Sequence, residues 1–181
     1  FLQTGLLYVQ TASSMIPAKV LGPDAGDHVL DMCAAPGSKT THIAALMGNR
    51  GSIDAWDVYP HKVKLIKDNA KRLGISIIHT EVRDSVKPLP FLYETYDKVL
   101  LDAPCSGLGV LGHKVELRWR RKESDLSVFP PLQKQLIEQA AKYTKTGGVL
   151  VYSTCTLNPD ENEHIINEFL SLHSEFALEE F

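Results

Sequence analysis

Short apolar runs alternate along this chain with longer segments whose apolar residues recur at helical spacing. An apolar run bounded by glycine, proline or polar residues is typical of a buried strand, and a spacing of three and four residues is typical of an amphipathic helix. The pattern predicts strands at residues 29–33, 52–57, 75–82, 96–103 and 149–154. It predicts helices at residues 39–47, at 60–73, after Pro130-Pro131 and after residue 158.

Local signals place the ends of these helices. Ser38 is expected to cap the first of them, and Pro60 suits the first turn of the second, where its missing N–H costs nothing. Gly74 is expected to close the second helix, and Gly147-Gly148 the third. The run Asn158-Pro159-Asp160-Glu161 resembles an N-cap with a glutamate at the third helical position.

Repeated strand-helix-strand units indicate the α/β class, with a parallel sheet covered by helices on both faces. Residues 1–26 show no clear period and are expected to form a lead-in segment that packs on the domain at 27–181. Residues 104–129 are expected to form a long, polar and basic connection.

The composition is that of a soluble globular domain, with 44% hydrophobic and 23% charged residues in a chain of 181. No apolar run is long enough to span a bilayer, so no membrane partner is expected. Three cysteines are too few for a disulfide scaffold, and neither they nor the histidines show a zinc spacing, so we expect no metal and a reducing, cytoplasmic compartment. The chain opens without methionine and ends abruptly, so we interpret it as a piece of a longer protein.

The net charge of -3 argues weakly against a nucleic-acid partner, but the charge is unevenly distributed. Residues 113–122 hold five basic side chains against the single Glu116. The basic residues are Lys114, Arg118, Arg120, Arg121 and Lys122. This stretch is either a phosphate contact or a solvated charged face.

Ligands of an open parallel sheet bind beyond the carboxyl ends of its strands, so the residues there are the candidates for chemistry. The loop after the first strand has neither a GxGxxG pattern nor a phosphate-loop pattern, which disfavours a nicotinamide dinucleotide or a nucleoside triphosphate. Asp57, twenty residues beyond Gly37, suits the ribose hydroxyls of an adenosyl group, although it is equally an ordinary loop aspartate. Asp84 suits an adenine amino group, but an exposed turn aspartate explains it as well.

Two cysteines follow two strands that are expected to be neighbours. Cys105 comes shortly after the fourth strand, close to Asp102, and Cys155 comes directly after the fifth. Either thiol alone fits an inert small hydrophobic residue. Together with Asp102 they predict a pocket that both thiols face.

These residues carry a resemblance to a known family. The runs DMCAAPGSKT at 31–40, DAPCSG at 102–107 and YSTCT at 152–156, with Glu161-Asn162-Glu163 after them, resemble the Sun (Fmu) family of RNA 5-methylcytosine methyltransferases. The lead-in at 5–22 resembles that family's entry segment, and residues 118–122 resemble its bacterial 16S ribosomal RNA cytosine-5 methyltransferase B branch. One departure is Ser38, where the family commonly has glycine. The resemblance also implies that the C-terminal end of the family's catalytic domain, after about Phe181, is missing from this chain.

The resemblance implies a Rossmann-like fold that binds S-adenosylmethionine. The residues that match the family's cofactor site are Cys33, Ala34, Ala35, Pro36, Gly37, Ser38, Lys39, Asp57, Asp84 and Asp102. It also implies that Cys155 is the nucleophile that attacks cytosine carbon 6, that Cys105 assists product release, and that Asp102 and Lys39 lie close to the base.

Several alternatives stay open from the sequence. DNA cytosine methyltransferases use the cysteine of a Pro-Cys pair, which here would be Cys105. The RNA substrate is 16S ribosomal RNA or, within the same family, a tRNA. A non-catalytic RNA-binding protein of ribosome assembly is the alternative from a different class.

A helix beginning at residue 158 is expected to favour the Cys155 thiolate, and Lys39 to add positive charge.

Overall fold

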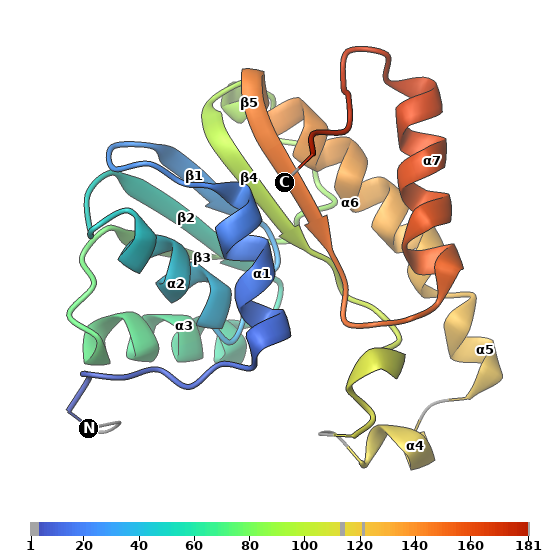
Figure 1. The fold of residues 1–181 in the computed structure, drawn as a ribbon, viewed down its shortest axis with the longest axis horizontal. Helices are drawn as coiled ribbons and strands as arrows, with labels where there is room; N and C mark the ends of the chain where they lie inside the picture. The colour runs from blue at the N-terminus through green and yellow to red at the C-terminus, as the bar shows by residue number, and fades with distance from the viewer. Residues whose placement is uncertain (1–3, 113–114, 121, 181) are drawn as a thin grey trace.

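A single sheet of five parallel strands forms the centre of the molecule, in the order β3-β2-β1-β4-β5 (Figure 1). The computed structural model describes residues 4–112, 115–120 and 122–180. The strands are β1 (His28–Asp31), β2 (Ser52–Asp57), β3 (Ile78–Val82), β4 (Tyr96–Asp102) and β5 (Thr144–Ser153). The predicted α/β class is therefore confirmed, and the strand order reverses between β1 and β4.

Helices cover both faces of the sheet, as the alternation predicts (Figure 1). On one face lie α1 (Ala12–Leu21), α2 (Ser38–Leu46) and α3 (Pro60–Arg72), and on the other lie α6 (Phe129–Tyr143) and α7 (Glu163–Leu172). Successive residues of a strand point to opposite faces, so Leu30 packs towards α6 and α7, whereas Val29 packs towards α1 and α2.

The lead-in segment contains a helix that the hydrophobic pattern did not reveal. Thr11 caps α1 by accepting the Ser14 N–H, and Gly22 ends the helix in the left-handed conformation. Pro17 inside α1 obscures the helical signal, but Ala18 and Leu21 are fully buried in the core. Packing against α2 and β5 therefore stabilises a helix of weak local propensity.

The expected cap at Ser38 is wrong by one residue. Gly37 occupies the N-cap position of α2, with a φ of +98° and no side-chain hydrogen bond, and Ser38 is the first helical residue. A Cβ at Gly37 would lie 3.1 Å from the Cα of Ile66 on α3. Glycine is needed there because the loop after β1 turns in a left-handed conformation directly against α3.

Two other helix ends differ from expectation. α6 ends at Tyr143 and not at Gly147-Gly148, because Thr144 pairs with Tyr96 and the chain bulges before Val149 resumes the pairing opposite Lys98. Asn158 caps only a single 3-10 turn, η3 (Pro159–Glu161), and α7 begins afterwards at Glu163.

In the part of the β4–α6 connection that the structure describes, the chain forms three short helical elements. These are η2 (Leu108–Val110), α4 (Leu117–Arg120) and α5 (Glu123–Leu126), and a 3-10 turn, η1 (Pro90–Leu92), precedes β4. Across the described residues, every helix is too short or too polar to traverse a lipid bilayer.

Substituting Gly37 tests the close approach of the loop after β1 to α3. Gly26 is the matched control, because its φ is +106° but an added Cβ there meets no described atom within 4 Å. We expect Gly26→Ala to lower the free energy of unfolding by about 1 kcal/mol, and Gly37→Ala to lower it by roughly 2 kcal/mol more, because the methyl group also displaces α3. Urea denaturation of both variants measures the difference, and equal losses would contradict this packing.

Candidate active site

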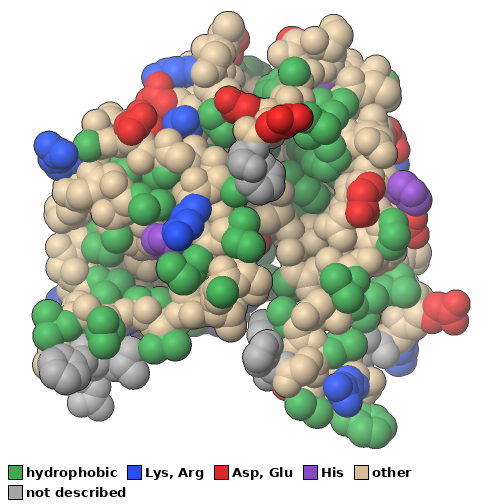
Figure 2. All heavy atoms as spheres, viewed as in Figure 1, with side chains coloured by type: hydrophobic (Ala, Val, Ile, Leu, Met, Phe, Trp, Pro, Cys, Tyr) green, Lys and Arg blue, Asp and Glu red, His purple; other side chains and the backbone are tan. Residues whose placement is uncertain are grey.

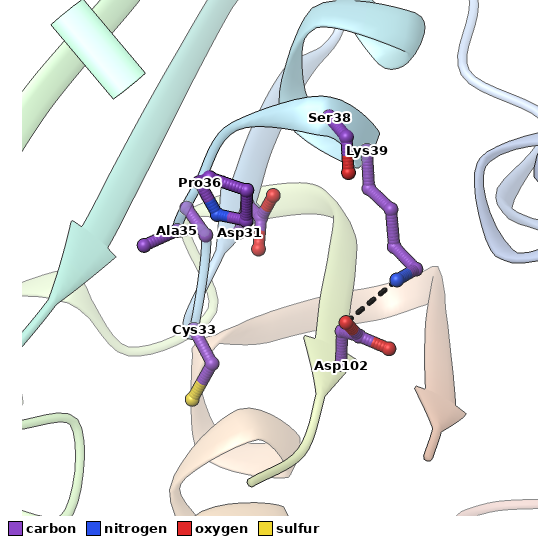
Figure 3. Close-up of a pocket in the computed structure, with 8 residues that line it drawn as sticks. Asp31, Cys33, Ala35, Pro36, Ser38, Lys39 and Asp102 are labelled. Atoms are coloured by element: carbon purple, nitrogen blue, oxygen red, sulfur yellow. Dashed lines mark hydrogen bonds and ion pairs between the residues drawn. The ribbon is translucent and has the colours of Figure 1, made fainter. Parts of the chain in front are cut away.

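The loop after β1 and the end of β4 enclose a small pocket of about 40 Å³ (Figure 3). Its lining residues are Asp31, Cys33, Ala34, Ala35, Pro36, Ser38, Lys39 and Asp102. The pocket lies beside the reversal of strand order, where the loops after β1 and β4 lead to helices on opposite faces of the sheet. Most of the predicted cofactor residues thus share one cavity, while Gly37, Asp57 and Asp84 are not among those that line it.

Lys39 and Asp102 form an ion pair across this pocket. The Lys39 Nζ lies 2.7 Å from the Asp102 Oδ2 (Figure 3). The Ser153 hydroxyl donates to the Asp102 Oδ1 at 2.8 Å. Asp102 is therefore held from both sides by groups on α2 and β5. The sequence predicts that Lys39 adds positive charge near Cys155. In the structure its ammonium group pairs with Asp102 and neutralises that carboxylate.

Asp31 is a pocket residue that the predicted site did not include. Its Oδ2 accepts from the Thr40 hydroxyl at 2.7 Å, while its buried Oδ1 has no hydrogen-bond partner among the described residues. Burial raises the pKa of Asp31 to about 7, against the lowering effect of the Thr40 hydrogen bond. A buried acceptor without a donor at the wall of a cavity is suited to a ligand that brings its own N–H group.

Asp57 and Asp84 lie at the same edge of the sheet as this pocket. Asp57 ends β2, is largely buried, and accepts the Tyr59 N–H at 3.0 Å. Asp84 follows β3 and accepts the Val86 N–H at 3.3 Å in a local turn. Burial raises the pKa of the Cys33 thiol, and the negative charges of Asp31, Asp57 and Asp102 raise it further. These three carboxylates therefore lie close enough to one another to act on the same side chain.

The two cysteines of the sheet edge meet directly. The Cys105 Sγ lies 3.0 Å from the Cys155 Sγ, and the Cys155 N–H donates to the Cys105 Sγ at 3.2 Å. Cys105 is buried and Cys155 is exposed. The expectation that both thiols converge from adjacent loops is confirmed.

The environment distinguishes the two thiols. The hydrogen bond with Cys155 and burial together raise the pKa of Cys105 well above its ordinary value, which favours the protonated thiol at the buried position. The helix predicted to begin at residue 158 begins instead at Glu163, because the one-turn η3 lies between Cys155 and α7. The N-terminus of α7 is therefore further along the chain from Cys155 than predicted. The neighbouring thiol is therefore the nearer group that can stabilise a Cys155 thiolate.

Residues beyond the two cysteines connect their loops, and the sequence interpretation missed them. Glu161 was expected to cap a helix, but its carboxylate turns inwards and accepts from the Ser106 N–H and from Gln133 on α6. The Ser106 and Thr156 hydroxyls lie 2.7 Å apart and join the same two loops. No local sequence signal marks Glu161 as buried, because its partners Ser106 and Gln133 are distant in sequence.

The basic stretch is only partly described. Arg118 and Lys122 are exposed on and beside α4, and Trp119 between them is 86% exposed. Lys114 and Arg121 lie outside the described residues, as does the side chain of Arg120. In the space-filling view, hydrophobic and basic side chains meet at the tip of this region (Figure 2). Among the described residues, no cluster of histidine, cysteine and acidic side chains is arranged to bind a metal.

Comparison with known proteins places this geometry in a family context. The family model described as 16S rRNA methyltransferase RsmB/F matches residues 18–181. The chain is 44% identical over 177 residues to "Probable ribosomal RNA small subunit methyltransferase B" of Bacillus subtilis, which covers 97% of this chain and 40% of that protein. It is 43% identical over 169 residues to "tRNA (cytosine(72)-C(5))-methyltransferase NSUN6" of Mus musculus, covering 87% of this chain and 35% of that protein.

A solved structure supports the same grouping. The crystal structure of NSun6 from Pyrococcus horikoshii with SFG superposes with a TM-score of 0.86 at 40% identity, over 94% of this chain and 43% of that one. The chain thus spans well under half the length of each of these relatives.

The buried Asp31 predicts a defined pH dependence of stability. Its folded pKa of about 7 exceeds the ordinary 3.8, so the folded protein holds a proton that the unfolded chain releases. The stability that Asp31 contributes is therefore complete below pH 4 and is lost as the pH rises to about 7. We expect Asp31→Asn to remove this loss, so that its free energy of unfolding gains on wild type by up to about 4 kcal/mol between pH 4 and pH 7.5.

Urea denaturation at several pH values checks this, with Asp68→Asn on the exposed face of α3 as the control. The control should follow the wild-type curve. An Asp31→Asn curve that runs parallel to wild type would show that Asp31 ionises normally.

Proposed function

Because the chain belongs to the RsmB/F family of 16S rRNA methyltransferases, we propose that it carries the catalytic site of an S-adenosylmethionine-dependent RNA cytosine-5 methyltransferase. The observation that supports this most is the 3.0 Å contact of two unlike thiols, one buried and one exposed, at the sheet edge that also holds Asp102. A non-catalytic RNA-binding protein would have no need of this arrangement.

The cofactor site we propose is the pocket after β1. The orphaned Oδ1 of Asp31 and the carboxylates near Cys33 suit a ligand that carries an ammonium and a sulfonium group. The loop residues Cys33, Ala34, Ala35, Pro36, Gly37, Ser38 and Lys39 would surround the amino-acid end of S-adenosylmethionine. Asp57 would accept from the ribose hydroxyls and Asp84 from the adenine amino group, since both follow neighbouring strands at the same edge.

Cys155 is the better nucleophile of the two cysteines. It is exposed, whereas Cys105 is buried, and the hydrogen bond between the thiols together with burial raises the pKa of Cys105. A thiolate is the nucleophilic form of cysteine, and a neighbouring S–H donor stabilises it. We assign the attack to Cys155 and assistance in product release to Cys105.

The reaction proceeds through a covalent adduct on the RNA base. The Cys155 thiolate forms a bond to cytosine carbon 6, and the electrons of the ring's 5,6 double bond become available on carbon 5. S-adenosylmethionine, when bound, supplies an electrophilic methyl group for carbon 5 and keeps the electron pair of its broken carbon–sulfur bond. A base then takes the proton from carbon 5, the double bond re-forms, and the bond to Cys155 breaks with its pair returning to sulfur.

Asp102 and Lys39 orient the base during this sequence. Asp102, fixed by Lys39 and Ser153, holds the edge of the cytosine and favours protonation of ring nitrogen 3, which makes carbon 6 more electrophilic. The target base must leave any helical stack to reach the thiols, which unpaired RNA loops permit. Because the thiol pair must stay reduced, we place the reaction in the cytoplasm.

The substrate we propose is 16S ribosomal RNA, following the family description. A tRNA is the alternative, because the similarity to the tRNA enzyme NSUN6 is almost equal. Bisulfite sequencing of RNA from cells that lack the protein distinguishes the two: loss of a 5-methylcytosine from 16S ribosomal RNA supports the first, and loss from a tRNA the second.

Serine substitution of each cysteine tests the proposed roles. In the protein that contains this chain, we expect Cys155→Ser to abolish methyl transfer and to form no adduct, because a hydroxyl is a far weaker nucleophile. We expect Cys105→Ser to retain the attack and to accumulate a protein–RNA adduct. Denaturing gels with tritiated cofactor measure both, and an adduct with Cys155→Ser alone would reverse the roles to those of DNA methyltransferases.

Charge reversal beside α4 tests RNA contact by the basic stretch. We expect Arg118→Glu combined with Lys122→Glu to weaken RNA binding about tenfold or more and to flatten its salt dependence, because phosphate contacts release counterions. Lys64→Glu combined with Lys71→Glu, both exposed on α3, is the control of equal charge change. Fluorescence anisotropy at several salt concentrations measures the effect, and equal weakening by both pairs would indicate a solvated face with no specific contact.

A further inference from the structure

Glu161 is the most enclosed acidic side chain near the thiol pair. It is 0% exposed, although it lies only six residues beyond the exposed Cys155. A carboxylate without solvent needs several donors, and donors on Ser106, Gln133 and Asn158 reach Glu161. The Ser106 N–H donates to its Oε2 at 2.8 Å, the Gln133 amide donates to the same oxygen at 3.1 Å, and the Asn158 amide donates to its Oε1 at 3.2 Å.

These contacts hold Cys105 from both sides along the chain. Ser106 directly follows Cys105 and binds Glu161 through its backbone N–H. Pro104 directly precedes Cys105, and its carbonyl accepts at 2.9 Å from the same Gln133 amide that donates to Glu161. The backbone on each side of Cys105 is therefore fixed by one buried network that spans α6 and η3.

The same network reaches the loop of Cys155. The Ser106 hydroxyl lies 2.7 Å from the hydroxyl of Thr156, the residue after Cys155. Asn158 belongs to that loop, and the Tyr152 hydroxyl donates to the Glu161 carbonyl at 2.7 Å from the end of β5. Glu161 therefore sits between the two loops whose sulfur atoms are 3.0 Å apart.

We propose that Glu161 is a positioning residue that holds Cys105 against Cys155 for the release step of the reaction. It acts through Ser106, Gln133 and Asn158. The proposal rests on the proposed function, because it concerns the breakdown of the Cys155–RNA adduct that Cys105 assists. Glu161 binds the backbone directly after Cys105, and Gln133 binds the carbonyl directly before it, whereas on the Cys155 loop Glu161 reaches Asn158, three residues beyond that cysteine. Loss of the Glu161 carboxylate therefore displaces Cys105 more than Cys155 and slows release more than attack.

Glu161→Gln is the sharpest variant. An amide keeps the size of the side chain but offers only one acceptor oxygen, so at least one donor of the network is left facing an N–H₂ group. Glu163→Gln is the matched control, because Glu163 is an exposed glutamate two residues further along the same segment. Gln133→Met is a second variant that keeps the volume of the side chain and removes the donor to Pro104 and Glu161.

The experiment measures adduct and turnover in the protein that contains this chain. We expect Glu161→Gln to accumulate the covalent RNA adduct about tenfold over wild type and to lower kcat by about tenfold or more, with the KM for RNA within about threefold. Gln133→Met should shift both quantities in the same direction, and Glu163→Gln should match wild type. Cofactor affinity by calorimetry should stay within about twofold in all three, which a general loss of folding would not allow.

Cys105→Ser separates the two hypotheses. If Cys105→Ser traps adduct and the Glu161 and Gln133 variants that still bind cofactor do not, the positioning role is overturned while the proposed function stands. If neither Cys105→Ser nor Cys155→Ser traps an adduct, the proposed function fails, and an adduct with Cys155→Ser alone would overturn the positioning role together with the assigned roles of the two cysteines. A parallel fall of kcat and cofactor affinity in both variants, without adduct, would assign Glu161 a purely structural role and would also overturn the proposal.

Discussion

The parallel pairing of β4 with β5 is the contact on which the site depends. Asp102 lies opposite Ser153 at the carboxyl ends of these strands, and the Ala103 N–H extends the ladder by donating to the Ser153 carbonyl at 2.8 Å. Cys105 is three residues beyond Asp102 and Cys155 is two residues beyond Ser153, so the register brings both sulfur atoms to the same height. A shift of one residue would turn every side chain of a strand to the other face and separate the thiols.

The order of the strands adds the cavity to this pair. The chain leaves β1 towards α2 on one face and leaves β4 towards α6 on the other, so the loops diverge and open a space between them. Lys39, one residue into α2, reaches back across that space to Asp102. The ion pair thus connects the cofactor side of the site to the thiol side, and the position of one depends on the other.

The sequence predicted the sheet, the helices on both faces and the meeting of Cys105 with Cys155, because strand alternation and the position of residues after a strand are local signals. It did not predict α1, whose Pro17 weakens the helical pattern and whose stability comes from tertiary packing. It placed the cap at Ser38 because serine prefers that position, whereas the tight approach of Ile66 requires Gly37 there. It interpreted Glu161 as a capping residue because its donors on Ser106 and Gln133 are distant in sequence and become neighbours only in the fold.

Three carboxylates of the site, those of Asp102, Glu161 and Asp31, differ in what their surroundings leave them able to bind. Asp102 is neutralised by Lys39 and oriented by Ser153, so it presents a fixed carboxylate to the opening. Glu161 is fully buried and accepts from Ser106, Gln133 and Asn158, so it is closed to a ligand and binds the protein's own loops. Asp31 alone among the three has a buried oxygen that no described donor reaches, and the cost of that burial appears as a pKa of about 7. A ligand that brings a positively charged N–H donor to Asp31 would lower this pKa and stabilise the buried carboxylate. The desolvation free energy that destabilises this carboxylate in the free protein would then be offset in the complex, which favours binding.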